Sequence, residues 1–257
     1  ALQGLGVKLG DRVGTVAWNT HRHFELYFGI SGLGAVLHTI NPRLSPEHVA
    51  YIANHAEDKV IFVDLNLLPI VEGVFDRLET VKHVVVMTDR AHMPATSRIP
   101  GLLCYEELIA GRPGTLAWPD FDERTASSLC YTSGTTGNPK GVLYSHRSTM
   151  IHSMMASNGA VIPMDPDTTL LPVVPMFHAN AWGLIYAAPM CGAKIVLPGP
   201  KLDGASIYEL LDKEQVTLSA GVPTVWLALL DYCAQNKLRM SSVKRTLIGG
   251  SAVPLAM

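Results

Sequence analysis

The chain has 257 residues, of which 48% are hydrophobic and 16% are charged, enough apolar material for a large core in one or two domains. Its 20 Lys and Arg residues nearly balance 22 Asp and Glu residues, and no basic stripe stands out, so nucleic acid is not an expected partner. The longest nearly apolar stretch, residues 181–193, contains Pro189 and is shorter than the roughly 20 residues that a membrane-spanning helix needs. We therefore predict a globular protein without a transmembrane segment.

The ends of the chain and its cysteines suggest two expectations, one about the length of the natural protein and one about its cellular location. The N-terminus has no initiator Met, basic region or apolar region of a signal peptide, and we expect both ends to lie within a longer protein. The cysteines are widely spaced and form no CxxC pair, which is typical of reduced packing residues and favours a cytoplasmic location. They are Cys104, Cys130, Cys191 and Cys233.

Short β-branched runs alternate with amphipathic segments along the chain, a pattern typical of an α/β fold with mainly parallel sheets flanked by helices. We predict strands at residues 13–17, 60–64, 83–88, 127–131, 169–174, 194–197, 217–220 and 245–248. We predict helices at residues 22–35, 46–56, 66–78, 105–110, 147–157, 179–189, 205–214 and 223–236. The region 90–122 is rich in Pro and Gly and is interpreted as a long connection. It divides a first α/β sub-domain, residues 1–122, from a second, residues 123–257, which ends where another helix would begin.

A glycine-rich loop, YTSGTTGNPKG, follows the predicted strand 127–131. Its glycines allow close backbone approach, its hydroxyls can donate to phosphate oxygens, and its lysine supplies a positive charge. The glycines are Gly134, Gly137 and Gly141, and the lysine is Lys140. The hydroxyl groups belong to Thr132, Ser133, Thr135 and Thr136. A polar surface turn is the alternative, but a turn does not need this combination within eleven residues. The loop is not a Walker loop, which would require glycine at Pro139 and Ser or Thr at Gly141.

The motif matches, over its whole length, the phosphate-loop signature of the adenylate-forming superfamily, which includes acyl-CoA synthetases, luciferases and peptide-synthetase adenylation domains. Three further segments resemble family motifs in the same order: PVVPMFHANAWG at 172–183, AGVPTVW at 220–226 and GGSAVP at 249–254. The resemblance covers essentially the whole chain, which within the superfamily resembles a medium-chain or long-chain fatty-acyl-CoA synthetase. It identifies the chain as an N-terminal-domain fragment, with the C-terminal domain absent.

The resemblance implies roles for individual residues. Lys140, Thr132 and His178 are expected to be catalytic, and the loop residues Thr132 to Gly137 with Lys140 to bind nucleotide. The adenine side is expected at Gly249, Gly250, Ser251 and Ala252. The acyl pocket is expected at His178, Trp182, Gly221, Val222, Pro223 and Thr224. His178 stands where peptide-synthetase domains place an aspartate for a substrate amine, which favours a plain carboxylic acid. Core packing is the alternative for His178 and Trp182.

Other reaction classes lack their motifs. The histidines and cysteines show no zinc-binding spacing, so Mg²⁺ is expected to arrive with ATP, near Thr132, rather than at a protein-built site. No GxSxG elbow occurs, so hydrolase chemistry is not supported.

The implied reaction uses ATP to activate a carboxylic acid, expected to be a fatty acid, to an acyl-adenylate. The acyl group is then transferred to CoA as a thioester, and AMP is released. An aryl-CoA ligase or a luciferase-like enzyme is an alternative on the same scaffold, and a non-catalytic nucleotide-binding fragment is another. We expect the fragment alone to be inactive or weak, because further family motifs lie beyond Met257 in relatives. The acyl chain length stays open, and a homodimer is an expectation from the family alone.

Overall fold

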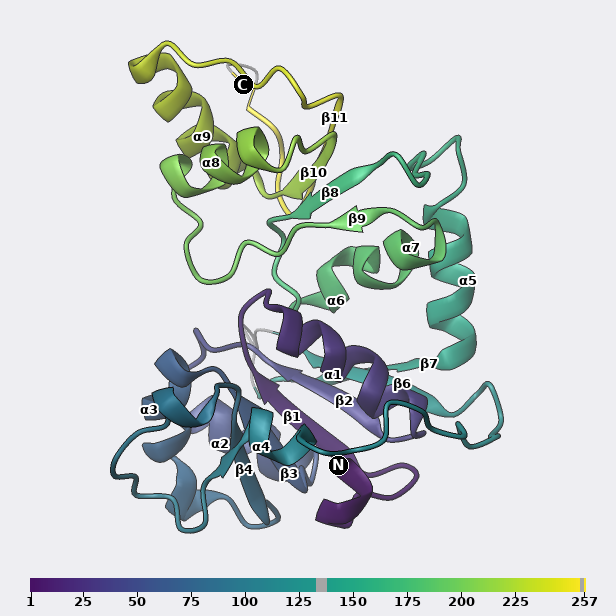
Figure 1. Ribbon diagram of the computed structural model, residues 1–257, viewed down its shortest axis with the longest axis vertical. Helices are drawn as coiled ribbons and strands as arrows, with labels where there is room; N and C mark the ends of the chain where they lie inside the picture. The colour runs from purple at the N-terminus through teal and green to yellow at the C-terminus, as the bar shows by residue number, and fades with distance from the viewer. Residues whose placement is uncertain (133–137, 255–256) are drawn as a thin grey trace. The chain divides into compact units, whose positions relative to one another are not determined.

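The computed structural model describes residues 1–132, 138–254 and 257. It divides into two compact units (Figure 1). Unit 1 comprises Ala1–Ala17 and Arg22–Thr149, and unit 2 comprises Trp18–His21 and Met150–Met257. This division differs from the predicted sub-domain boundary after Asp122, because the strand that precedes the glycine-rich loop pairs with the sheet of unit 1.

Unit 1 is built on a seven-stranded sheet in the order β5-β4-β3-β1-β2-β6-β7. Its strands are β1 (Arg12–Val16), β2 (Val36–Ile40), β3 (Val60–Val63), β4 (His83–Val86), β5 (Leu103–Cys104), β6 (Ala126–Tyr131) and β7 (Gly141–Ser145). All neighbours run parallel except β6 and β7, which are antiparallel. The apolar run of β3 is buried along its full length, as expected for a strand covered on both faces.

The helices of unit 1 follow local sequence cues. They are α1 (His21–Gly32), α2 (Pro46–His55), α3 (Leu68–Glu72) and α4 (Tyr105–Ile109), with 3₁₀ turns at Leu2–Leu5, Leu65–Leu67, Phe75–Arg77 and Arg90–His92. Helix α2 starts as predicted, since the Ser45 hydroxyl accepts a hydrogen bond from the His48 amide at 3.3 Å and Pro46 occupies the first turn. Helix α5 (His146–Ala156) follows β7 and continues from unit 1 into unit 2.

Unit 2 contains a four-stranded parallel sheet in the order β11-β10-β8-β9. Its strands are β8 (Thr169–Pro172), β9 (Lys194–Ile195), β10 (Leu218–Gly221) and β11 (Arg245–Ile248). Its further helices are α6 (Ala179–Trp182), α7 (Leu184–Met190), α8 (Gly204–Lys213) and α9 (Pro223–Asn236), and α8 and α9 lie side by side (Figure 1). The core includes Ile207 and Leu211 from α8 and Trp226 and Leu229 from α9.

The fold class predicted from sequence is confirmed, two predicted helices need correction, and three short strands were missed. The predicted helix 66–78 is broken into a short helix between two 3₁₀ turns, because Gly73 follows its last residue. The predicted helix 179–189 is interrupted at Gly183, and its first residues are left-handed. Strands β2, β5 and β7 were not predicted. None of the helices within the described residues has the length and apolarity to cross a bilayer.

Candidate functional site

The stem of the glycine-rich loop closes with a reciprocal pair of hydrogen bonds. The ladder between β6 and β7 pairs Tyr131 with Gly141. One step further, the Thr132 amide donates to the Lys140 carbonyl at 3.0 Å, and the Lys140 amide donates to the Thr132 hydroxyl oxygen at 3.1 Å. The two predicted catalytic residues of this loop are therefore held next to each other at its base.

Both stem side chains are available to an anionic ligand. Thr132 and Lys140 are exposed, and the ammonium group of Lys140 has no carboxylate partner within the part of the chain that the structure describes. The Thr132 oxygen accepts from the Lys140 amide, so its own proton can be donated elsewhere. This donor set suits a phosphate group. The predicted phosphate contacts at Ser133, Gly134, Thr135, Thr136 and Gly137 lie outside the described residues.

In unit 2, three segments singled out from sequence follow the carboxyl ends of three adjacent parallel strands. The segment with His178 and Trp182 follows β8, that with Val222 and Thr224 follows β10, and Gly249 to Ala252 follow β11. Ligands in open parallel sheets bind outside the carboxyl ends of the strands. The sheet thus gathers the predicted acyl-pocket and adenine-side segments at one edge.

Asn19 organises the segment that follows β8. Its side-chain amide donates to the carbonyls of Pro172 at 2.8 Å and Val174 at 3.0 Å, and its oxygen accepts from the Met176 amide at 2.7 Å. The residue is only 4% exposed. Asn19 has no motif of its own and was missed from sequence. The one sequence signal that could have identified Asn19 is its position just beyond the carboxyl end of β1, because functional residues are common at such positions in parallel sheets.

The residues directly after His178 form a left-handed turn. Ala179, Asn180, Ala181 and Trp182 have φ values of 45°, 54°, 48° and 56°, and Gly183 follows at 75°. Left-handed backbone in non-glycine residues costs roughly 1–2 kcal/mol each and persists only where surrounding structure imposes it. Such strain is concentrated at functional sites. His178 itself is exposed and has extended backbone.

Small residues permit close contacts between the three segments. A Cβ atom on Gly249 would lie 3.1 Å from Cη2 of Trp182, and one on Gly250 would lie 3.2 Å from Cγ1 of Val222. The structure therefore brings Trp182 to Gly249 and Val222 to Gly250. Both glycines border a predicted acyl-pocket residue.

The remaining candidates in unit 2 differ in exposure. Gly221 and Pro223 are buried, and the Gly221 carbonyl accepts from the indole of Trp226 at 3.2 Å. Thr224, Ser251 and Ala252 are exposed. These last three can contact a ligand, whereas Gly221 and Pro223 shape the turn into α9.

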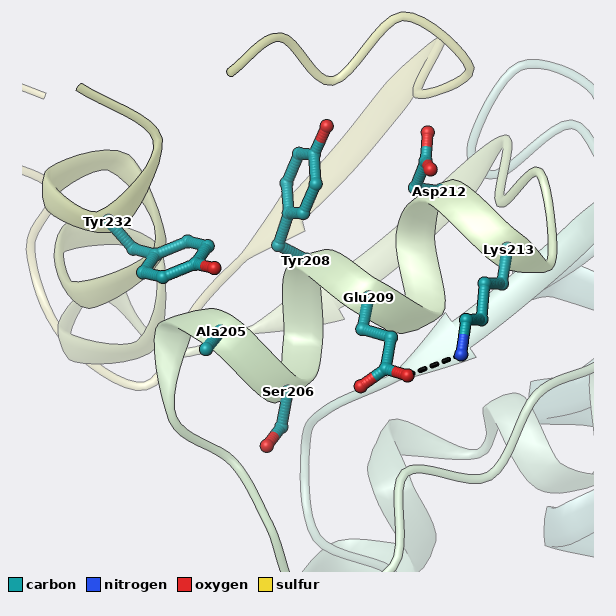
Figure 2. A pocket seen from close by; sticks show the side chains of 7 residues that line it. All are labelled: Ala205, Ser206, Tyr208, Glu209, Asp212, Lys213 and Tyr232. Carbon is teal, nitrogen blue, oxygen red and sulfur yellow. Dashed lines mark hydrogen bonds and ion pairs between the residues drawn. The ribbon is translucent and has the colours of Figure 1, made fainter. Parts of the chain in front are cut away.

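Two surface cavities are lined by other residues. One of about 360 Å³ lies on α8 and α9, and its lining includes Tyr208, Tyr232 and the Glu209–Lys213 ion pair (Figure 2). A second, of about 200 Å³ in unit 1, is mainly apolar and includes Phe62, Tyr105 and Trp118. Neither contains a residue proposed from the motifs. Within the described residues, no cluster of His, Cys, Asp or Glu could hold a metal ion.

Comparison with known proteins identifies the group to which this arrangement belongs. The sequence profile described as "AMP-binding enzyme" matches residues 1–257. The chain belongs to the AMP-binding enzyme family.

Several relatives of the chain are named as CoA ligases. The chain is 52% identical over 257 residues to a 3-methylmercaptopropionyl-CoA ligase of Ruegeria lacuscaerulensis, covering 100% of the chain and 48% of the relative. It is 51% identical over 257 residues to a medium-chain-fatty-acid–CoA ligase of Ectopseudomonas oleovorans, covering 100% of the chain and 47% of the relative. The chain thus spans about half the length of these AMP-binding enzymes.

A solved structure agrees with the fold. The crystal structure of an anthranilate CoA ligase in complex with anthranoyl-AMP superposes with a TM-score of 0.88 at 26% sequence identity. The superposition covers 98% of this chain and 48% of the other. The architecture is therefore that of the N-terminal part of an AMP-binding enzyme.

Proposed function

We propose that the protein carrying this chain activates a carboxylic acid with ATP and transfers the acyl group to coenzyme A. The two hydrogen bonds between Thr132 and Lys140 carry this proposal. They place a hydroxyl donor and an ammonium without a carboxylate partner among the described residues at the base of a loop with the family's phosphate signature. The relatives named as CoA ligases support it.

In the first step a carboxylate oxygen attacks the α-phosphorus of ATP, the bond from that phosphorus to the bridging oxygen breaks, and pyrophosphate leaves. Lys140 and Thr132 would bind phosphate oxygens and stabilise negative charge as the bond breaks. In the second step the CoA thiolate attacks the acyl carbon and AMP leaves. Mg²⁺ would accompany the nucleotide, coordinated mainly by phosphates and water.

The acid-binding side of the reaction is assigned to unit 2. Trp182, Val222 and Thr224 would contact the acyl group, and Gly249 to Ala252 would lie along the adenine, where small residues let a flat ring approach backbone. His178 would contact the carboxylate through its imidazole ring. An aliphatic acid is favoured, because the relatives at 51% and 52% identity are named for methylmercaptopropionate and medium-chain fatty acid.

An aromatic acid is the second candidate, favoured by the anthranilate CoA ligase structure. A chimera separates the two, in which this chain replaces the matching stretch of the Ectopseudomonas oleovorans ligase. Thioester formation is measured with 3-methylmercaptopropionate, octanoate, palmitate, benzoate and anthranilate, with the parent ligase as control. Faster turnover of the aliphatic acids is expected. Preference for anthranilate or benzoate would support the second candidate, and a folded chimera that forms no thioester while the parent does would contradict both.

A further inference from the structure

The start of the loop is tied to a distant helix by one hydrogen bond. The hydroxyl of Tyr131, the last residue of β6, lies 2.6 Å from Nδ1 of His55, the last residue of α2. The two rings meet edge to face, with centroids 5.8 Å apart and an interplanar angle of 85°. This bond joins residues 76 positions apart in the sequence.

The Tyr131 ring is also confined on its other sides. The ring of His38 lies 5.1 Å away between centroids, and His38 is itself held by a 2.7 Å hydrogen bond from Nδ1 to Oδ2 of the buried Asp58. A Cβ atom on Gly141 would lie 3.3 Å from Cζ of Tyr131. The last glycine of the loop motif therefore leaves room for the phenol ring.

His55 is positioned for this contact by its own helix. The ring of Tyr51, one turn earlier in α2, stacks on the ring of His55 at 5.4 Å and 26°. His55 is exposed, so it contributes little buried surface to the core of unit 1. Its distinctive contribution is the hydrogen bond to Tyr131.

The Tyr131 hydroxyl stays protonated at neutral pH. Burial raises the pKa of Tyr131 to about 12, with the charge of Asp58 and the neighbouring Tyr51 acting in the same direction and Arg12 opposing them. The phenol can therefore donate to Nδ1 of a neutral imidazole. The bond requires no charged partner.

Tyr131, the residue held by His55, directly precedes Thr132 at the closed end of the loop stem. Tyr131 pairs with Gly141, and the adjacent residues Thr132 and Lys140 exchange the two hydrogen bonds that close the stem. Freeing the Tyr131 side chain would let this end of the ladder fray, since terminal pairs open most readily. Three observations support one inference: the His55–Tyr131 hydrogen bond, the confined Tyr131 ring and the paired hydrogen bonds between Thr132 and Lys140. We infer that His55 is a positioning residue that, through Tyr131, holds Lys140 for the phosphates of ATP. This inference rests on the proposed function.

Amide hydrogen exchange of the ligand-free chain tests the effect of the His55–Tyr131 hydrogen bond and requires no catalytic activity. Tyr131→Phe and His55→Leu each remove the hydrogen bond and should speed exchange of the Thr132 and Lys140 amides about 5-fold, the equivalent of one net hydrogen bond. His55→Asn places a side-chain amide near Nδ1 and should restore most of the protection. The amide of Asp64, which donates to the Val16 carbonyl at 3.0 Å, reports on the sheet elsewhere and should be unchanged.

Tyr144→Phe is the matched control, because Tyr144 lies on the adjacent strand β7 and no partner for its hydroxyl occurs in the described part of the chain. It should leave exchange of the stem amides unchanged. Unchanged stem exchange in both Tyr131→Phe and His55→Leu would overturn the inference, as would equal acceleration at Asp64.

ATP binding by the same variants, measured by calorimetry with Mg²⁺ present, tests the consequence. Tyr131→Phe and His55→Leu should weaken binding about 5-fold and His55→Asn less. Equal affinity in all variants despite faster stem exchange would overturn the role in positioning Lys140. If the unsubstituted chain does not bind ATP but the exchange effects are present, the result counts against the proposed function. The stabilisation of the loop stem by the His55–Tyr131 hydrogen bond would then still be supported.

Discussion

The side-chain oxygen of Asn19 accepts a hydrogen bond from the backbone amide of Met176 at 2.7 Å, joining the segment after β1 to the segment that leads to His178. The same side chain donates to two further carbonyls, those of Pro172 and Val174. One buried residue thus accepts from or donates to three backbone groups at and just beyond the end of β8. The path of the chain toward His178 depends on this side chain.

Asn19→Ala should destabilise unit 2 by about 2–4 kcal/mol, because it leaves a buried amide and two buried carbonyls without their partner. Urea unfolding measures the change. Asn236→Ala, which removes an exposed side chain that donates to the Tyr232 carbonyl at 2.8 Å, is the control and should cost about 1 kcal/mol or less. An equal loss in the two variants would contradict the organising role of Asn19.

Ala179→Gly should stabilise the protein by about 1 kcal/mol, because glycine adopts the left-handed backbone without the steric cost that alanine bears. The same change at Ala228, an exposed position within α9, should destabilise by about 1 kcal/mol. Thermal or urea unfolding of the two variants gives the comparison. Destabilisation at both positions would indicate that residue 179 is right-handed, as the sequence pattern predicted.

Gly183→Ala should destabilise by about 2–3 kcal/mol for two separable reasons. A Cβ atom would lie 2.5 Å from Nδ1 and Cε1 of His152, and the backbone has a φ of 75°. The double variant Gly183→Ala with His152→Ala should recover the steric part and retain about 1 kcal/mol of backbone strain. If the double variant is no more stable than Gly183→Ala, the contact with His152 is not the cause.

Asp58→Asn should become more stable relative to the unsubstituted chain as pH rises. Burial raises the pKa of Asp58 above its ordinary value of 3.8, and the neighbouring His38 opposes this shift. Stability from such a carboxyl is fully present below its unfolded pKa and is lost as pH rises through the folded value. Asparagine resembles the protonated form and does not titrate. Urea unfolding between about pH 4 and pH 8 measures the difference, and a difference that is constant with pH would contradict the assignment.

The sequence predicted most strands and helices because their apolar patterns were clear. It missed β2, where the polar residues His38 and Thr39 interrupt an otherwise apolar run, although both are buried. Pairing with β1 and β6, and the contact of His38 with Asp58, stabilise this strand, and those partners are distant in sequence.

The residues of the candidate site that lie in a sequence motif could be predicted. Those whose role depends on tertiary contacts could not. Thr132 and Lys140 came from the loop signature, and the structure adds the hydrogen bonds that join them. The helical pattern at 179–189 concealed the left-handed turn, because periodicity does not report the sign of φ. Asn19 and His55 contact partners 157 and 76 positions away, and neither lies in a sequence motif that names those partners.

Carboxylate-dependent exchange of labelled pyrophosphate into ATP, without CoA, tests the central claim most directly, because exchange requires reversible formation of the acyl-adenylate. The chimera with the Ectopseudomonas oleovorans ligase should exchange label only when an acid substrate is present. Lys140→Ala should reduce the rate about 100-fold or more, the cost of removing one donor that stabilises developing charge. Exchange at the same rate in Lys140→Ala, or exchange that does not depend on the acid, would contradict the account.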